Sequence, residues 1–235
     1  MTFDADVALP GRAPARLPSI RELLVDAGFR EDFLGDDRPP ATHYRLKDSG
    51  SGFYAEFLTP LIGSELTRDG KRKATAHVAG VNSQQLRFIE LLLDNPWQVS
   101  LQAGELGLSE PRTVRIASPV GFLAQKLLIH RKRDAADQAK DVLLYMHETL
   151  QVFGARLEEL QQEWIGQLQP QLHPKDAKIV VTAANRVFGE VTDTIREAAA
   201  MAADRDLDPH DVQQACRYGL SIVLAAKKSA RAFRA

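Results

Sequence analysis

The sequence predicts an α+β fold, in which a mixed β-sheet core precedes an all-helical C-terminal half. Up to residue 117, short β-like runs are separated by connections rich in Gly, Pro and Asp. From Ser118 onward, apolar residues recur with the helical period. The 235 residues are 44% hydrophobic and 26% charged, which is ordinary for a globular chain and excludes wholesale disorder.

The expected strands fall in pairs. Residues 2–8 alternate, with Asp4 and Asp6 on one face and apolar side chains on the other. Residues 43–47 and 53–58 flank a glycine-serine turn and are predicted to form a hairpin. Residues 97–103 and 113–117 are predicted to form a second β pair.

The expected helices are identified by their capping residues. A first helix over residues 19–27 opens with the capping box Ser19-x-x-Glu22 and stops at Gly28. A second is expected over residues 83–93. In the C-terminal half, Ser118 caps a helix that runs to about residue 131, and Asp208 caps the last one, which runs to about residue 233. The helices expected between these two span residues 135–153, 156–168 and 175–203. The pattern thus suggests three parts: a core over residues 1–117, helices packing on it over 118–168, and a helical hairpin over 169–235.

Composition excludes several classes of protein. Lys and Arg number 30 against 31 Asp and Glu, so no global basic field indicates nucleic-acid binding. The lone Cys216 excludes a disulfide framework and is expected to be a buried structural thiol. No apolar run approaches the roughly 18 residues of a membrane span, and the N-terminus lacks the basic residues of a signal peptide. We therefore expect a cytoplasmic protein.

Carboxylates are the most informative side chains. Residues i and i+2 of a strand point the same way, about 7 Å apart, so Asp4 and Asp6 repel each other unless a cation lies between them. Mg²⁺ prefers such oxygen ligands and keeps positions open for phosphate. Glu56, on an adjacent strand, would complete a phosphoryl-transfer site. The alternative is a solvated, frayed N-terminal segment.

A basic stripe follows Ser118. Lys126, His130 and Arg133 are spaced to lie on one side of a helix. Such a stripe is commonly a solvated helix face. Beside a metal-carboxylate site, however, it could hold a triphosphate.

The chain resembles a bacterial nucleotidyltransferase-like family of the DNA polymerase β-like superfamily, akin to minimal nucleotidyltransferases and abortive-infection toxin transferases. The resemblance covers about residues 2–150 and rests on four motifs in order. They are Asp4-Ala5-Asp6-Val7-Ala8-Leu9-Pro10, Ala55-Glu56-Phe57-Leu58-Thr59-Pro60, Ser118-Pro119-Val120-Gly121-Phe122-Leu123-Ala124-Gln125-Lys126-Leu127 and Lys140-Asp141.

The resemblance implies a role for each matching residue. Asp4 and Asp6 would be the paired ligands of Mg²⁺ or Mn²⁺, and Glu56 the third acid, which helps to hold the metal and activates the acceptor. Lys126 would reach the nucleotide phosphates, with Arg133 as a weaker candidate. The reaction would transfer a nucleoside monophosphate from an NTP to a hydroxyl, with pyrophosphate leaving.

One departure from the family concerns the phosphate-binding loop. The family carries a Gly-Ser or Gly-Gly loop upstream of its D-x-D, whereas here only residues 1–3 precede Asp4. Backbone N–H groups of such loops bind phosphate. Two explanations stay open: a further N-terminal segment, which the intact D-x-D alternation favours, or a shortened relative with impaired catalysis.

A non-catalytic interaction protein is the alternative. The helices of the C-terminal half would then bind a partner or dimerise, and the apolar positions of residues 175–203 must pack on the core or on another subunit. If the chain is an enzyme, its acceptor could be a small molecule, a tRNA or a protein hydroxyl.

Overall fold

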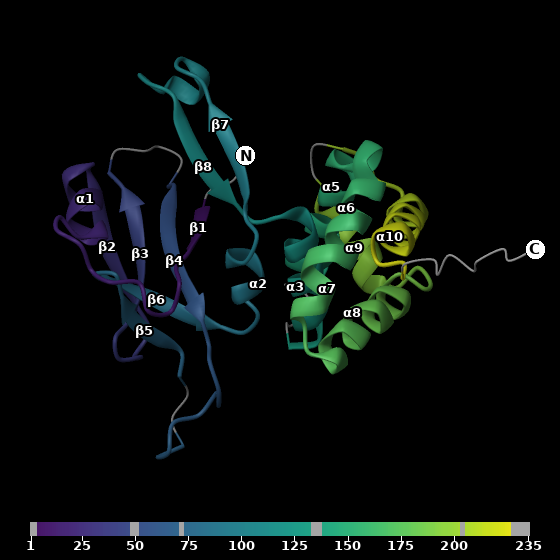
Figure 1. Cartoon of the computed structure of the whole chain (residues 1–235), viewed down its shortest axis with the longest axis horizontal. Helices are drawn as coiled ribbons and strands as arrows, with labels where there is room; N and C mark the ends of the chain where they lie inside the picture. Colours follow the sequence, from purple (N-terminus) through teal and green to yellow (C-terminus); the bar gives the residue numbers. More distant parts are fainter. Residues whose placement is uncertain (1–3, 48–51, 71–72, 133–137, 203–204, 227–235) are drawn as a thin grey trace, which may run out of the picture. The chain divides into compact units, whose positions relative to one another are not determined.

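The computed structural model describes residues 4–47, 52–70, 73–132, 138–202 and 205–226. The chain divides into two compact units, Met1–Asp94 and Asn95–Ala235 (Figure 1). This division falls before the second β pair, earlier than the boundary at residue 117 that the sequence suggests. The reason is that these two strands form a separate two-stranded sheet and that Trp97 packs edge-on against Phe153 of the helical part, with ring centroids 5.3 Å apart.

The first unit is built on a mixed sheet. Its elements are β1 (Asp4–Ala8), α1 (Ile20–Asp26), β2 (Phe29–Leu34), β3 (Ala41–Leu46), β4 (Tyr54–Pro60), β5 (Thr75–Val78), β6 (Val81–Leu86) and α2 (Glu90–Leu93). Among the described residues, six strands form this sheet in the order β2-β3-β4-β6-β5, and β1 pairs with β4 outside that path. Strands β1 and β6 run parallel to β4, whereas β3 and β4 form the expected antiparallel hairpin.

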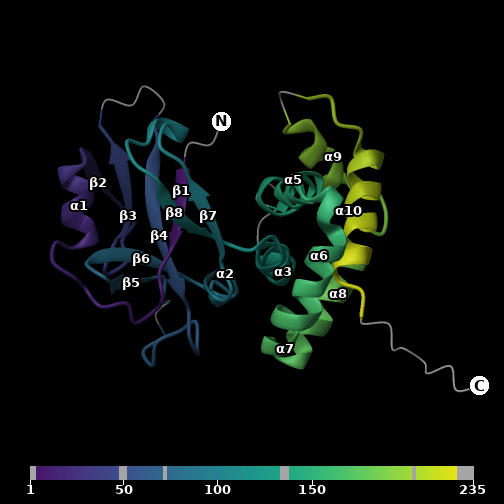
Figure 2. The same ribbon diagram turned by 45° about the horizontal axis from the view of Figure 1, so that its top comes forward.

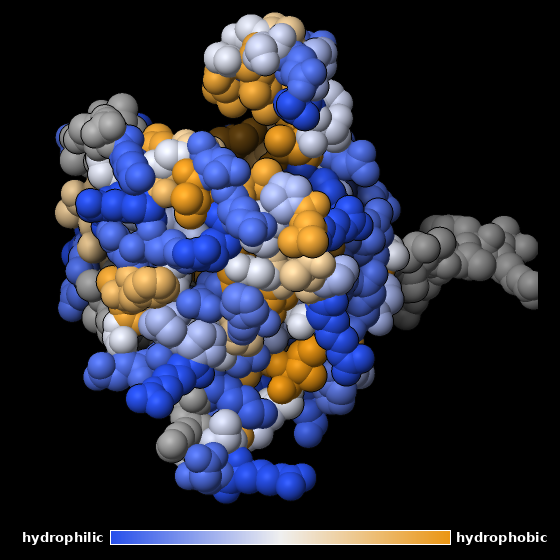
Figure 3. Space-filling view, turned by 90° about the vertical axis from the view of Figure 1, so that its left-hand side faces the viewer, coloured by the Kyte–Doolittle hydropathy of each residue, from blue (hydrophilic) through white to orange (hydrophobic). Residues whose placement is uncertain are grey.

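Helix α1 packs on one face of this sheet, beside β2 and β3 (Figures 1 and 2). Tyr44 and Phe57 are buried beneath it, with their rings edge to face at 5.4 Å, and Ile20 and Leu24 of the helix close the cluster. Burying a large apolar side chain contributes about 1.5–3 kcal/mol, so this cluster holds α1 to the sheet. The outer surface on this side is mainly hydrophilic, with separate hydrophobic patches (Figure 3).

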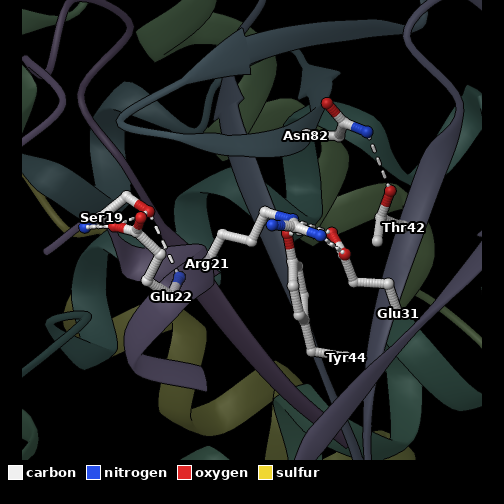
Figure 4. Close-up of polar contacts among 7 residues, drawn as sticks. All are labelled: Ser19, Arg21, Glu22, Glu31, Thr42, Tyr44 and Asn82. Atoms are coloured by element: carbon white, nitrogen blue, oxygen red, sulfur yellow. Dashed lines mark hydrogen bonds and ion pairs between the residues drawn. The ribbon is translucent and has the colours of Figure 1, made fainter. Parts of the chain in front are cut away.

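Polar contacts fix the start of α1 and its place on the sheet (Figure 4). Ser19 forms the predicted capping box: its Oγ accepts from the Glu22 N–H at 3.2 Å, and its own N–H donates to Glu22 Oε2 at 2.6 Å. One turn away, Arg21 Nε donates to Glu31 Oε2 of β2 at 2.8 Å. The Tyr44 hydroxyl donates to the same carboxylate at 3.4 Å, so Glu31 links helix, edge strand and core.

The helix expected over residues 83–93 is wrong in its first half. Residues Val81–Leu86 form β6, which pairs with both β4 and β5, and only Glu90–Leu93 is helical. Ser83 is fully buried while Asn82 and Gln84 on either side are half-buried, which is the alternation of a strand. The pairing partners on both sides of β6, rather than local propensity, decided this segment.

The second unit combines a β-hairpin with a helical bundle. Its elements are β7 (Trp97–Leu101), η1 (Glu105–Gly107), β8 (Arg112–Ile116), α3 (Pro119–Ile129), η2 (His130–Lys132), η3 (Gln138–Leu144), α5 (Tyr145–Val152), η4 (Gly154–Arg156), α6 (Leu157–Glu163), η5 (Trp164–Leu168), α7 (Gln169–Gln171), α8 (Pro174–Val187), α9 (Asp193–Ala200) and α10 (Pro209–Val223). Leu123, Met146, Trp164, Phe188 and Ile195 are fully buried in the bundle. Within the described ranges, no helix is both long and apolar enough to cross a membrane.

The helix expected over residues 175–203 is two helices, so that prediction is also wrong. Helix α8 ends at Val187, and α9 begins at Asp193 after Thr192, whose hydroxyl accepts the Ile195 N–H and caps the new start. The last helix begins at the predicted cap Asp208 but ends at Val223. The remainder of its expected span, from residue 227, lies outside the described residues.

Candidate active site

The sheet face opposite α1 carries the carboxylates. Phe57 points toward α1, so its strand neighbours Tyr54 and Glu56 do not both share its face: Glu56, one residue away, lies on the opposite one, together with Tyr54. In the parallel register of β1 and β4, Asp4 is opposite Tyr54 and Asp6 is opposite Glu56. Strand pairing therefore brings the three predicted acids together on one face.

Glu56 has the most perturbed carboxyl group of the three. Its side chain is only 17% exposed, whereas Asp4 and Asp6 are exposed. Burial, followed by a hydrogen bond and repulsion from Asp6 and repulsion from Asp4, raises the pKa of Glu56 to about 7. Glu56 therefore binds a proton more readily than an ordinary glutamate does.

Two further side chains contact Glu56. Gln84 Nε2 of β6 donates to Glu56 Oε2 at 2.6 Å. His43 of β3 is the Cα partner of Glu56 on the other side of β4, and its Nε2 lies 3.3 Å from the same oxygen. The His43 ring stacks on Tyr54, with centroids 4.1 Å apart. Burial, then the nearby Arg45 charge, lowers the pKa of His43, so its neutral form is favoured.

Arg45 supplies positive charge beside this group. It is the Cα partner of Tyr54, and its guanidinium carbon lies 5.8 Å from the centre of that ring. Arg45 Nε donates to Asp32 Oδ2 at 2.8 Å, and Nη1 donates to the Gly52 carbonyl at 3.0 Å. These contacts orient the guanidinium at the edge of the carboxylate face.

The three acids provide the type of ligand that a hard cation takes. Their oxygens match the preference of Mg²⁺, and the raised pKa of Glu56 reports like-charge repulsion that a cation would relieve. Among the described residues, no group of three or more His, Cys, Asp or Glu side chains is already arranged as a metal site. Metal binding by Asp4, Asp6 and Glu56 therefore requires side-chain rotation.

The predicted basic residues lie apart from this strand cluster in the chain. Lys126 belongs to α3 of the second unit, where its Nζ lies 5.1 Å from the Phe122 ring centre and 5.8 Å from that of Tyr145. His130 is buried in the same unit, with Nε2 2.9 Å from Arg186 Nη2, so it does not form part of an exposed stripe. Arg133 lies outside the described residues. A phosphate contact by Lys126 stays a prediction.

The family of the chain follows from comparison with known proteins. A family model described as Nucleotidyltransferase matches residues 1–165. The chain therefore belongs to this nucleotidyltransferase family, as the sequence motifs indicate, and its general activity is nucleotidyl transfer with an NTP as substrate. Comparisons with curated proteins and with solved structures gave no match.

Sequence reasoning missed His43 and Gln84 as neighbours of the acids. A signal existed for His43, because the predicted hairpin already places residues 43–47 beside residues 53–58. Gln84 was hidden by the helix expected over residues 83–93. The alternation of Val81 and Ser83 with Asn82 and Gln84 would have indicated a strand.

Proposed function

We propose that this chain is a Mg²⁺- or Mn²⁺-dependent nucleotidyltransferase that transfers a nucleoside monophosphate from an NTP to a hydroxyl acceptor. The observation that carries the proposal is the register of β1 and β4, which sets Asp6 beside Glu56 and keeps Asp4 on the same face. Membership of the nucleotidyltransferase family supports this reading.

Asp4, Asp6 and Glu56 would hold the metal. When bound, the metal would supply charge neutralisation for the triphosphate. Lys126 and Arg133 are proposed to contact the phosphates, as the sequence motifs imply. The acceptor is proposed to be a hydroxyl of a small molecule, a tRNA or a protein.

Glu56 is suited to accept the proton of the attacking hydroxyl. A carboxylate with a pKa of about 7 is a better base at neutral pH than an ordinary glutamate. The acceptor oxygen would form a bond to the α-phosphorus while the bond from that phosphorus to the pyrophosphate oxygen breaks. The hydroxyl proton passes to the Glu56 carboxylate, and pyrophosphate leaves.

Calorimetric titration tests this proposal. Mn²⁺ and Mg²⁺ are titrated into the purified chain with and without NTP, and into the Asp4→Asn/Asp6→Asn double variant. We expect metal-dependent NTP binding that is lost in the double variant. The matched control is Asp36→Asn/Asp37→Asn, which removes the same charge from two exposed aspartates and should bind as the wild type does. No metal or NTP binding by the wild-type chain would contradict the proposal.

A further inference from the structure

Glu56 is held from a strand that the catalytic motifs do not include. Gln84 lies on β6, opposite Leu58 in the parallel register with β4, and Leu58 is two residues beyond Glu56. Because residues two apart on a strand share a face, Gln84 lies diagonally next to Glu56. Its Nε2 reaches Glu56 Oε2 at 2.6 Å.

The contact engages one particular oxygen of the carboxylate. His43 Nε2 lies 3.3 Å from that same oxygen, Oε2, so both neighbours converge on one side of the group. With its side chain 17% exposed, Glu56 is enclosed enough for such contacts to restrict its rotamers. Gln84 cannot change charge, so its amide N–H donates to Glu56 whatever the state of the carboxyl group.

We propose that Gln84 is a positioning residue for nucleotidyl transfer, which fixes the Glu56 carboxylate in the orientation that serves the metal and the acceptor hydroxyl. This inference rests on the proposed function. Hydrogen-bond partners of metal-ligating carboxylates act in this way in general, and their loss typically costs about 10–100-fold in metal affinity or activity. Gln84 acts through Glu56 and does not itself touch the substrate.

Mn²⁺ binding to Gln84→Met, followed by calorimetry and by the electron paramagnetic resonance spectrum of the bound ion, tests the inference. Methionine keeps the length of the side chain but removes the donor. The matched control is Gln85→Met, because Gln85 is the next residue of β6 and points to the other face of the sheet. We expect Mn²⁺ affinity to fall about 10-fold or more in Gln84→Met, with a changed spectrum, and to stay at the wild-type value in Gln85→Met.

A merely structural role would lower the melting temperature without altering the Mn²⁺ affinity of the folded protein. Should Gln84→Met fold poorly, Gln84→Asn keeps the amide but is one methylene too short for the 2.6 Å contact, and it should also weaken Mn²⁺ binding. Wild-type affinity in both folded variants would overturn the positioning role alone, provided that Asp4→Asn/Asp6→Asn abolishes binding. Absence of Mn²⁺ binding by the wild type would overturn the proposed function and this inference together.

Discussion

Asp6 of β1 and Glu56 of β4 are Cα partners in a parallel register, so two acids that are distant in the sequence lie side by side on one face of the sheet. Their proximity contributes, after burial, to the raised pKa of Glu56. The carboxylates therefore destabilise the fold where they are both ionised. Selection for nucleotidyl transfer gives this arrangement a physical reason.

Replacing Glu56 with glutamine should stabilise the protein at high pH. Burial and the two aspartates raise the pKa of Glu56 from 4.5 to about 7. Below pH 4.5 the group is protonated in both the folded and unfolded chains, and the penalty is absent. Between pH 4.5 and 7 the unfolded chain ionises first, so stability falls, and above pH 7 the full penalty applies. We expect Glu56→Gln to be on the order of 1–2 kcal/mol more stable than the wild type at pH 8, after discounting for solvent screening.

Urea unfolding at pH 4 and pH 8 in buffer with a chelator measures this difference. The stabilisation should vanish at pH 4. Glu190→Gln, at an exposed carboxylate of the second unit, serves as the control and should follow the wild type at both values. An equal effect of Glu56→Gln at the two pH values would show that repulsion among the acids is not its cause.

Removal of the α1 cap should destabilise the first unit. Ser19→Ala deletes the hydroxyl that accepts the Glu22 N–H, which typically costs about 1 kcal/mol. Ser19→Asp retains an acceptor at the same position and should recover most of that loss. Thermal unfolding of the three proteins gives the comparison, and equal melting temperatures for Ser19→Ala and the wild type would contradict the role of the cap.

Gly219 permits close packing of α10 on α5. A Cβ at this position would lie 2.9 Å from Leu150 Cδ2, so Gly219→Val overpacks the interface and should cost about 1–3 kcal/mol. Gly166→Val is the matched control, since a Cβ there meets nothing within 4 Å among the described residues. Chemical denaturation should separate the two variants, and a Gly219→Val protein as stable as Gly166→Val would refute the packing argument.

Trp97 attaches the β7–β8 hairpin to the helices of the second unit. Its Nε1 donates to Glu163 Oε2 at 3.1 Å, its ring meets Phe153 edge-on, and Arg156 lies 5.1 Å from the ring centre. Trp97→Ala should cost about 2–4 kcal/mol in unfolding free energy, less than a fully buried tryptophan would. Trp97→Phe keeps the ring contact but loses the hydrogen bond, and calorimetric unfolding should place it between the other two proteins.

Elements with local signals were predicted well from the sequence. The capping box of Ser19, the caps Ser118 and Asp208, and the antiparallel β3–β4 hairpin are all confirmed by the structure. Cys216 is buried, as expected of a structural thiol. These features depend on hydrogen bonds between residues close in the chain, so their residue types alone are informative.

Elements whose conformation depends on distant partners were not predicted. Val81–Leu86 forms a strand because β4 and β5 pair with it on either side. The separation of α8 from α9 was also missed, although Thr192 provides a cap for the second helix. Apolar residues with helical spacing continue across that break, so periodicity alone favoured one helix.

The sequence by itself determined the family, the α+β class and the alternation that sets Asp4 and Asp6 on one face of a strand. Only the tertiary structure decided that Asp6 pairs with Glu56 and that Gln84 reaches the same carboxylate. The physical reason is that alternation depends on backbone geometry within one strand, whereas register and cross-strand contacts depend on which segments pair after the chain folds.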